Sequence, residues 1–266
     1  MMNPPGASTS SVDASSEEPA GEAVPLLTVE GLSVTYGAAQ ALFGVSLQVR
    51  RGQAVAVLGV NGAGKSSLAQ AVCGLTPPSA GRIVFDGADV TGRSAARISR
   101  LGLAYLPEGR GIFRGLSVQD NLRMFFRGAG RAGSAQACVT AYEMFPRLAE
   151  RRRQTAGTLS GGEQQMLALA RVLAAGPRLV IADEPSLGLA PKLIDMVFEA
   201  LATARDAGVS IVLIEQYVHR ALAFVDTAVI LNRGAVTWSG PAAEAGDEVL
   251  VHYLGEKPTA DVSRSG

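Results

Sequence analysis

The sequence predicts an α/β fold with a mixed sheet as its core, an antiparallel β subdomain near the N-terminus and an inserted helical subdomain. Three observations support this prediction. Apolar runs of strand length, such as AVAVLGV and SIVLI, alternate with helical patterns over most of the chain, which is typical of a parallel α/β core. Residues 26–50 show strand-like alternation broken by glycines, as antiparallel strands do. Residues from about 117 to 150 carry helical patterning with few strand signals.

The composition is that of an ordinary globular protein. The chain has 266 residues, of which 47% are hydrophobic and 18% charged, so it can bury a sizeable core. Its 24 basic and 24 acidic residues give a net charge of zero, and we therefore predict no nucleic acid partner. Two distant cysteines, Cys73 and Cys138, suggest no disulfide framework and favour buried thiols in a reducing compartment.

Both ends of the chain differ from its centre. The first 25 residues have neither a basic start nor an apolar segment, so we predict a disordered tail rather than a signal peptide. No apolar run is long enough to span a bilayer, and the chain is not expected to cross a membrane by itself. We predict one domain over 26–255, with its helical subdomain at about 90–165, and a loose tail over 256–266.

The first half of the domain contains short elements separated by glycine and proline. The run QAVAVLG predicts a buried strand, and the glycine-rich turn after it leads into a helix over about 65–73. The PPSAG turn then separates this helix from a strand at RIVFDG. A helix near 94–100 and a strand at LAYLP follow, and the helical subdomain comes next.

The second half resumes the alternation of strands and helices. It begins with a helix whose Ser160 lies three residues before Glu163, the spacing of a capping box. Apolar residues then mark one face of this helix, at Met166, Leu169, Ala170 and Leu173. Strands are predicted at RLVIADEP, VSIVLIE, TAVIL and AVTWSG, with helices from Lys192 and Val218 between them.

The segment GVNGAGKS fits the phosphate-binding loop pattern and lies between an apolar strand and a helix. Its glycines allow backbone N–H groups to surround a phosphate, while Lys65 would bridge the β- and γ-phosphates and Ser66 would ligate Mg²⁺. A glycine-rich turn with an incidental lysine is the alternative, which the strand–loop–helix context disfavours. The predicted nucleotide-binding residues here are Gly59, Val60, Asn61, Gly62, Ala63, Gly64, Lys65, Ser66 and Ser67.

The segment RLVIADEP supplies the acidic half of such a site. Its apolar strand places Asp183 at the carboxyl edge of the sheet, where open α/β sheets bind their ligands. Asp183 would hold Mg²⁺ through water, and Glu184 would polarise the water that attacks the γ-phosphate. A strand that ends in a solvated acidic turn is the alternative.

The order of GVNGAGKS, LSGGEQQ and DEP resembles the ATP-binding cassette of ABC transporters, over about residues 26–255. The resemblance implies the P-loop NTPase fold of the ABC-cassette type, with ATP and Mg²⁺ as cofactors. It also implies that LSGGEQQ is the family signature, which contacts the γ-phosphate of an ATP held by a partner subunit. The residues that would serve the partner's nucleotide are Ser160, Gly161, Gly162 and Glu163. A plain capping box is a compatible interpretation of the same residues.

Other family positions carry over singly. Tyr36 is placed to stack on adenine, with a core tyrosine as the alternative. Glu108 stands where the family usually has a glutamine and would ligate Mg²⁺ or hold a water. Gln216 replaces the usual switch histidine and would contact phosphate in the catalytic step beside Glu184. Ala190 replaces an aspartate in the loop that links the two sites.

The segments LPEGRGIF, FPRLAERR, DEPSLGLAP and IEQ are together similar to the smaller ATP-binding subunit of branched-chain amino acid importers. This resemblance implies an ATPase that drives transport, located in the cytoplasm on the inner face of the membrane. Its partners would be transmembrane permease subunits, a second identical or different ATP-binding subunit and, indirectly, a solute-binding protein. FPRLAERR, residues 145–152, is either a solvated helix face or part of a docking surface for the permease.

Alternative functions remain. The cassette of an importer for urea, short-chain amides or another amino acid is close in pattern. A soluble ABC ATPase acting on ribosomes or DNA ends usually joins two cassettes or inserts long coiled coils, and this sequence shows neither. A phosphotransferase would use the phosphate loop but has no use for LSGGEQQ.

Overall fold

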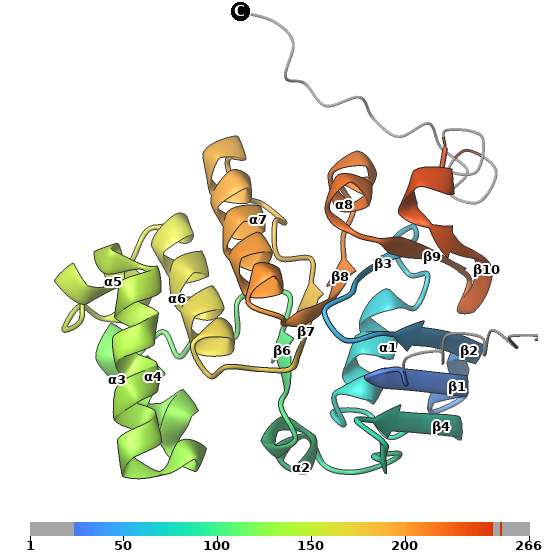
Figure 1. The fold of residues 1–266 in the computed structure, drawn as a ribbon, viewed down its shortest axis with the longest axis horizontal. Helices are drawn as coiled ribbons and strands as arrows, with labels where there is room; N and C mark the ends of the chain where they lie inside the picture. The colour runs from blue at the N-terminus through green and yellow to red at the C-terminus, as the bar shows by residue number, and fades with distance from the viewer. Residues whose placement is uncertain (1–23, 247–250, 252–266) are drawn as a thin grey trace, which may run out of the picture.

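The computed structural model describes residues 24–246 and residue 251, and it contains two sheets and a group of helices beside them (Figure 1). The larger sheet has six strands in the order β10-β9-β3-β8-β7-β6. Its strands are β3 (Ala54–Leu58), β6 (Leu103–Leu106), β7 (Leu179–Asp183), β8 (Ser210–Ile214), β9 (Thr227–Asn232) and β10 (Ala235–Pro241). All neighbours pair in parallel except β10, which is antiparallel to β9. Every residue of β3, β7 and β8 is buried, which explains why these strands are continuous apolar runs.

The smaller sheet is antiparallel, as predicted, with four strands in the order β2-β1-β4-β5. These strands are β1 (Leu27–Tyr36), β2 (Ala39–Val49), β4 (Ala80–Phe85) and β5 (Ala88–Asp89). Helix α1 (Lys65–Val72) packs between the two sheets. Its buried residues share one apolar core with inward-facing residues of β1, β2, β3, β4, β7 and β8. The phosphate loop that precedes α1 is therefore fixed from both sides.

Apart from α2 (Ala95–Arg100), whose buried Ile98 belongs to the core around α1, the remaining helices cover the other face of the large sheet and extend beyond its β6 edge (Figure 1). They are α3 (Val118–Phe125), α4 (Gly130–Met144), α5 (Pro146–Glu150), α6 (Gly161–Leu173), α7 (Pro191–Asp206) and α8 (Val218–Phe224). Short 3-10 turns lie at Phe126–Ala129, Ala156–Thr158 and Ala242–Glu244. Helices α3 to α5 form the predicted helical lobe. The predicted range of about 90–165 also includes β6, which pairs with β7 in the large sheet, so the helices that lie apart from the sheet begin at α3.

Helix α6 differs from its prediction because it is buried nearly all round rather than on one face. Leu167, Ala168 and Val172 are buried in addition to the predicted Leu169, Ala170 and Leu173, whereas the predicted Met166 is half-buried. The reason is that α6 lies between the lobe and the core, in contact with α3, α4, α5, α7 and β6. A helix in that position buries apolar residues on several sides, and its buried polar side chains Gln164, Gln165 and Arg171 form hydrogen bonds.

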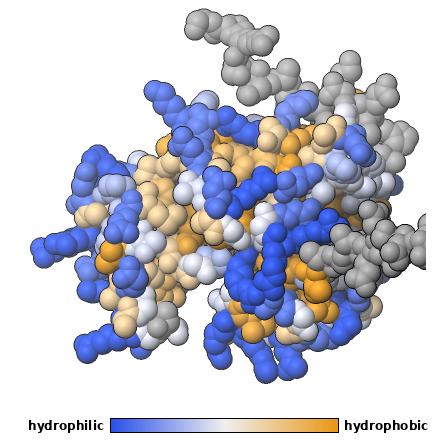
Figure 2. All heavy atoms as spheres, in the orientation of Figure 1, coloured by the Kyte–Doolittle hydropathy of each residue, from blue (hydrophilic) through white to orange (hydrophobic). Residues whose placement is uncertain are grey.

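The surface is mixed. On the face shown in Figure 2, hydrophilic residues lie both at the edges and across the centre, with apolar residues between them. Among the described residues, no helix combines the length and apolar character that a bilayer span requires. Cys73 is buried as predicted, whereas Cys138 is half-buried. The predicted tails over 1–25 and 256–266 lie outside the described residues, except for residues 24 and 25.

Candidate functional site

The phosphate loop connects β3 to α1, as the motif predicted. Gly64 has a φ of 103°, and a Cβ there would lie 2.7 Å from Cδ2 of Leu42 and 2.9 Å from the oxygen of Ala41. Only glycine fits this position. The ammonium of Lys65 is buried and donates hydrogen bonds to the carbonyl oxygens of Gly59 at 2.9 Å and Val60 at 3.3 Å. The loop thus wraps around the Lys65 ammonium, and a loop of this kind is suited to binding a phosphate.

Asp183 ends β7 and lies beside the loop. Its Oδ1 accepts a hydrogen bond from the Ser66 hydroxyl at 3.3 Å, and its Oδ2 accepts one from the Tyr105 hydroxyl at 2.9 Å. Burial raises the pKa of Asp183, although the bonds from Tyr105 and Ser66 act to lower it. Burial and the neighbouring Asp183 raise the pKa of Tyr105, which remains a donor. Tyr105 did not emerge from the sequence patterns, where its only signal is a polar group near the end of the strand LAYLP.

Glu184 follows directly and faces the same loop. Its backbone is left-handed, with φ of 48°, and its N–H donates to the carbonyl of Ile214 at 2.9 Å. One carboxylate oxygen lies 3.7 Å from Nζ of Lys65, and the other accepts from Nε2 of Gln216 at 3.2 Å. The same Gln216 amide donates to Oδ1 of Asn61 at 2.9 Å. The two predicted catalytic residues and the phosphate loop therefore come together.

Glu215, which the sequence patterns did not single out, holds the surroundings of these two residues in place. It is buried and accepts from the backbone N–H of Ser186 and of Gln216, each at 3.1 Å. Burial raises its pKa, while the hydrogen bonds from Ser186 and Gln216 act in the opposite direction. The sequence signal is an acid at the end of an apolar strand, VSIVLIE, parallel to the one in RLVIADE.

Tyr36 and Glu108 occupy the margins of the site. The Tyr36 hydroxyl donates to Oγ of Ser67 at 3.5 Å and to Oε1 of Gln70 at 3.4 Å, and 45% of the residue is exposed. An exposed ring beside α1 is available for stacking, which stays a prediction. Glu108 is exposed. Within the described part of the chain, no hydrogen bond or ion pair connects it to Ser66 or Asp183.

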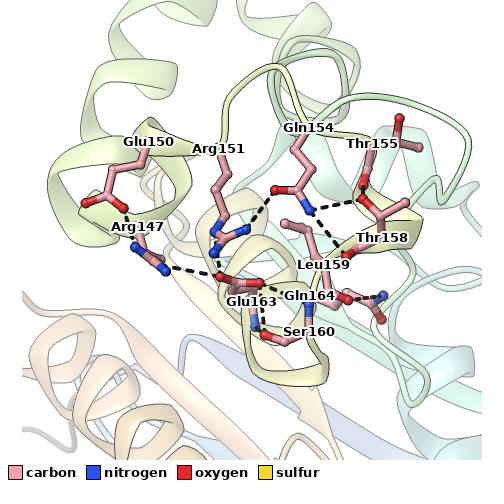
Figure 3. A network of polar contacts seen from close by, with 10 residues as sticks. All are labelled: Arg147, Glu150, Arg151, Gln154, Thr155, Thr158, Leu159, Ser160, Glu163 and Gln164. Atoms are coloured by element: carbon pink, nitrogen blue, oxygen red, sulfur yellow. Dashed lines mark hydrogen bonds and ion pairs between the residues drawn. The ribbon is translucent and has the colours of Figure 1, made fainter.

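The signature segment forms the predicted capping box at the start of α6. Oγ of Ser160 accepts from the Glu163 N–H at 3.3 Å, and the Ser160 N–H donates to Oε2 of Glu163 at 3.0 Å. Figure 3 shows two arginines from FPRLAERR that reach the other carboxylate oxygen, Nε of Arg151 at 2.7 Å and Nε of Arg147 at 3.5 Å. Burial acts to raise the pKa of Glu163. The hydrogen bonds from Ser160 and the positive charges of Arg151 and Arg147 outweigh burial, so the pKa is lowered. FPRLAERR therefore supports the signature from within the chain, a role beyond the two predicted for it.

The two signature glycines have different neighbours. A Cβ on Gly162 would lie 2.5 Å from Cδ2 of Leu193, so this glycine permits close packing of α6 against α7. A Cβ on Gly161 would lie 3.4 Å from Nη2 of Arg110, an ordinary contact with the end of a flexible side chain. Both glycines line a cavity of about 320 Å³, together with Ser160, Arg110, Arg147, Glu163, Met166, Leu193 and residues 188–190.

The signature is joined to the catalytic region indirectly. Nε2 of the buried Gln165 donates to the carbonyl of Pro185, directly after Glu184, at 2.9 Å. Among the described residues, no hydrogen bond or ion pair links Ser160 or Glu163 to the phosphate loop. The structure thus contains two separate half-sites, one at the phosphate loop and one at the signature.

Comparison with known proteins identifies the family of this chain. A profile of the ABC transporter family matches residues 42–187, more than half of the chain. The chain belongs to the ABC transporter family. As an ABC cassette it binds ATP and hydrolyses it.

Three relatives of this ABC cassette cover nearly all of its domain. The high-affinity branched-chain amino acid transport ATP-binding protein BraG of Pseudomonas aeruginosa is 40% identical, over 86% of this chain and 100% of BraG. The probable branched-chain amino acid transport ATP-binding protein LivF of Archaeoglobus fulgidus is 34% identical, over 87% and 97%. The lipopolysaccharide export system ATP-binding protein LptB of Escherichia coli is 33% identical, over 86% and 97%.

Solved structures share the fold. An ATP-binding subunit of an ABC transporter aligns with a TM-score of 0.75 and 29% identity, over 87% of this chain and 95% of that one. The ATP-binding cassette MJ0796, solved as a dimer in a post-hydrolysis state with ADP and Pi, aligns with a TM-score of 0.73 and 20% identity, over 81% and 98%. These likenesses confirm the predicted fold class.

Proposed function

We propose that this cassette is the energy-coupling subunit of an ABC importer for branched-chain amino acids. The observation that carries the proposal is the 40% identity to BraG over the whole of BraG. LivF, whose name also specifies branched-chain amino acid transport, supports it at 34% identity. LptB, at 33%, belongs by its name to an export system. Export is therefore one alternative, and import of urea, short-chain amides or other amino acids is another.

The residues present fit Mg²⁺. Ser66 and Asp183 offer hard oxygen atoms 3.3 Å apart at the edge of the sheet. The described residues contain no cluster of three His, Cys, Asp or Glu that would hold a metal alone. A site with few protein oxygens suits Mg²⁺, which also takes ligands from phosphate and water. Ser66 would hold the ion directly, Asp183 through water, and Glu108 from the segment after β6. When bound, the ion neutralises charge on the phosphates.

The chain's own residues would divide the hydrolytic work. Lys65 binds the β- and γ-phosphates, and Tyr36 stacks on the adenine. The Glu184 carboxylate accepts a proton from the attacking water as that water approaches the γ-phosphate. Gln216 already donates to both Asn61 and Glu184, so its amide is positioned to orient that water or the phosphate.

The signature would act on a nucleotide held by a second cassette, which is either another copy of this chain or a related subunit. Ser160, Gly161, Gly162 and Glu163 lie at the start of α6, whose free N–H groups favour an anion. The cassette MJ0796, which shares this fold, was solved as a dimer bound to ADP and Pi, and this supports the pairing of two cassettes. ATP binding would join the two cassettes, and hydrolysis would release them.

Transmembrane permease subunits would convert this cycle into transport, and a separate solute-binding protein would deliver the substrate to them. We accordingly place the cassette in the cytoplasm, on the inner face of the membrane. From the net charge of zero we propose no nucleic acid partner.

The decisive test of the catalytic assignment is Glu184→Gln, which keeps the size of the side chain but removes the base. We expect unchanged Mg²⁺–ATP binding, a fall in turnover of about 10²- to 10⁴-fold, and an ATP-bound dimer detectable by light scattering. Glu199→Gln, an exposed position on α7, is the matched control. Turnover at the normal rate in Glu184→Gln would exclude Glu184 as the hydrolytic residue.

The substrate is tested separately. A vesicle assay with the complete transporter would compare ATP-driven uptake of labelled leucine, acetamide and urea. We expect ATP-driven uptake of leucine with the wild-type cassette and no uptake with the Glu184→Gln cassette. Uptake of an amide alone would replace the branched-chain assignment, and outward movement would overturn the importer assignment.

A further inference from the structure

The cavity at the signature contains a cation that no carboxylate neutralises. Among the described residues, Arg110 has one hydrogen-bond partner, the neutral amide oxygen Oε1 of Gln164 at 2.6 Å from Nη1, and it forms no ion pair. Arg110 is half-buried. The nearby carboxylate of Glu163 is already occupied, since one oxygen faces Arg151 and Arg147 and the other accepts from Ser160 (Figure 3). A half-buried guanidinium without a counter-charge is a binding group for an anion.

The backbone around Arg110 is held in an unfavourable conformation. Gly109, Arg110 and Gly111 have consecutive φ values of 77°, 71° and 59°. Left-handed backbone is easy for the two glycines but is disfavoured for arginine, and such strain concentrates at functional sites. The turn places the Arg110 side chain against α6 rather than in solvent.

The signature itself leaves room for this side chain. A Cβ on Gly161 would lie 3.4 Å from Nη2, 3.9 Å from Nη1 and 4.0 Å from Cζ of Arg110, so the guanidinium lies over the glycine backbone. Arg110, Gly161 and Ser160 line the same cavity of about 320 Å³. Because Nη1 is used by Gln164, the N–H groups of Nη2 remain for a ligand. A guanidinium presents them in the fork geometry that suits phosphate oxygens.

We propose that Arg110 is a phosphate-binding residue of the signature half-site, where it contacts the triphosphate that a second cassette presents to Ser160. The inference rests on the proposed function, in which two cassettes share each nucleotide. It adds a cation without a carboxylate partner to a half-site whose other arginine, Arg147, is paired with Glu150 and Glu163. The competing explanation is structural: Arg110 would only fasten its turn to α6 through Gln164.

The test measures ATP-driven association of two copies of the full chain in a Glu184→Gln background, by analytical ultracentrifugation. Arg110→Gln removes the charge, Arg110→Lys retains it, and Arg110→Gly removes both the charge and the backbone strain. Arg233→Gln is the matched control, because Arg233 is an exposed arginine with φ of 47° in the β9–β10 turn. ATP binding to the separate protomers and thermal unfolding are measured for each variant, and association is repeated over a range of salt concentrations.

We expect Arg110→Gln and Arg110→Gly to weaken association about 100-fold, because each dimer would lose two charge-assisted contacts of about tenfold each. The association constant of Arg110→Lys should lie between those of these two variants and that of the parent, and the association constant of Arg233→Gln should equal that of the parent. ATP binding to the protomer should stay within about twofold, and the salt dependence of association should become shallower.

Unchanged association in Arg110→Gln and Arg110→Gly would overturn the inference. So would a loss that Arg110→Lys fails to reduce and that leaves the salt dependence unaltered, since this pattern identifies a structural fastening. Failure of the Glu184→Gln parent to associate with ATP is a separate result. It would exclude another copy of this chain as the second cassette of the proposed function, and it would leave a related subunit in that place.

Discussion

The two signature glycines should respond differently to alanine. Gly162 packs against α7, whereas Gly161 faces only the end of the Arg110 side chain. Both lie in the first turn of α6, and neither has a positive φ. The backbone therefore accepts alanine at both positions, and the difference between the two variants isolates the packing of α6 on α7.

The magnitude follows from the distances. A Cβ on Gly162 would lie 2.5, 2.8 and 3.2 Å from Cδ2, Cδ1 and Cγ of Leu193. All three are closer than carbon atoms pack, so Leu193 or α7 must move, at a cost of about 1–3 kcal/mol. Alanine recovers up to about 1 kcal/mol of helix propensity relative to glycine. The net expectation is a loss of about 1 kcal/mol for Gly162→Ala, and no loss or a gain of a few tenths for Gly161→Ala.

Urea denaturation measures the free energy of unfolding, followed by the fluorescence of Trp238, the single tryptophan, and by circular dichroism. The double variant Gly162→Ala/Leu193→Ala supplies the control, because it removes the side chain that the new methyl group meets. Its loss should be smaller than the sum of the two single losses by about 1 kcal/mol. Equal effects of alanine at positions 161 and 162, or strict additivity with Leu193→Ala, would refute the packing argument.

Two further predictions concern the groups behind the catalytic residues. Tyr105→Phe removes the hydrogen bond to Oδ2 of Asp183 and should weaken Mn²⁺ binding in the presence of ATP by about tenfold; electron paramagnetic resonance measures this, and an unchanged affinity would contradict it. Glu215→Gln should destabilise the chain more at pH 5 than at pH 8. Burial raises the pKa of Glu215, so the folded wild type gains stability as the pH falls toward the ordinary pKa near 4.5. The glutamine variant gains no such stability, because its side chain does not titrate. Urea denaturation across this pH range is the measurement, and a difference that is constant or shrinks on acidification would be the contrary result.

Local patterns predicted the parts of the site that are local in sequence. The phosphate loop, the acidic end of β7 and the capping box at Ser160 each lie within one short segment, and their residue types follow from the chemistry of that segment. The fold class was predictable for the same reason, because buried parallel strands require continuous apolar runs. The burial of α6 on all sides was not, since its neighbours α3 and α7 come from distant parts of the chain.

The contacts that join the segments were beyond prediction from one sequence. Tyr105 and Asp183 are separated by 78 positions and meet only because β6 pairs with β7. Arg110 and Gln164 are 54 positions apart and meet across the edge of the lobe. Spacing along the chain does not determine strand order or the packing of a helical insertion, so the partner of an exposed-looking arginine stays unknown until the fold is available.

The left-handed backbone of Glu184 sets the stability of the fold against the proposed catalytic use of this side chain. Glycine would relieve a conformation that is disfavoured by about 1–3 kcal/mol in other residues. With Glu184 as the proposed hydrolytic residue, a cassette selected for heat tolerance alone would gain stability from glycine there and would lose the carboxylate that hydrolysis is proposed to need. On this proposal, glutamate at this position allows the nucleotide to be hydrolysed and released, at a cost in backbone strain.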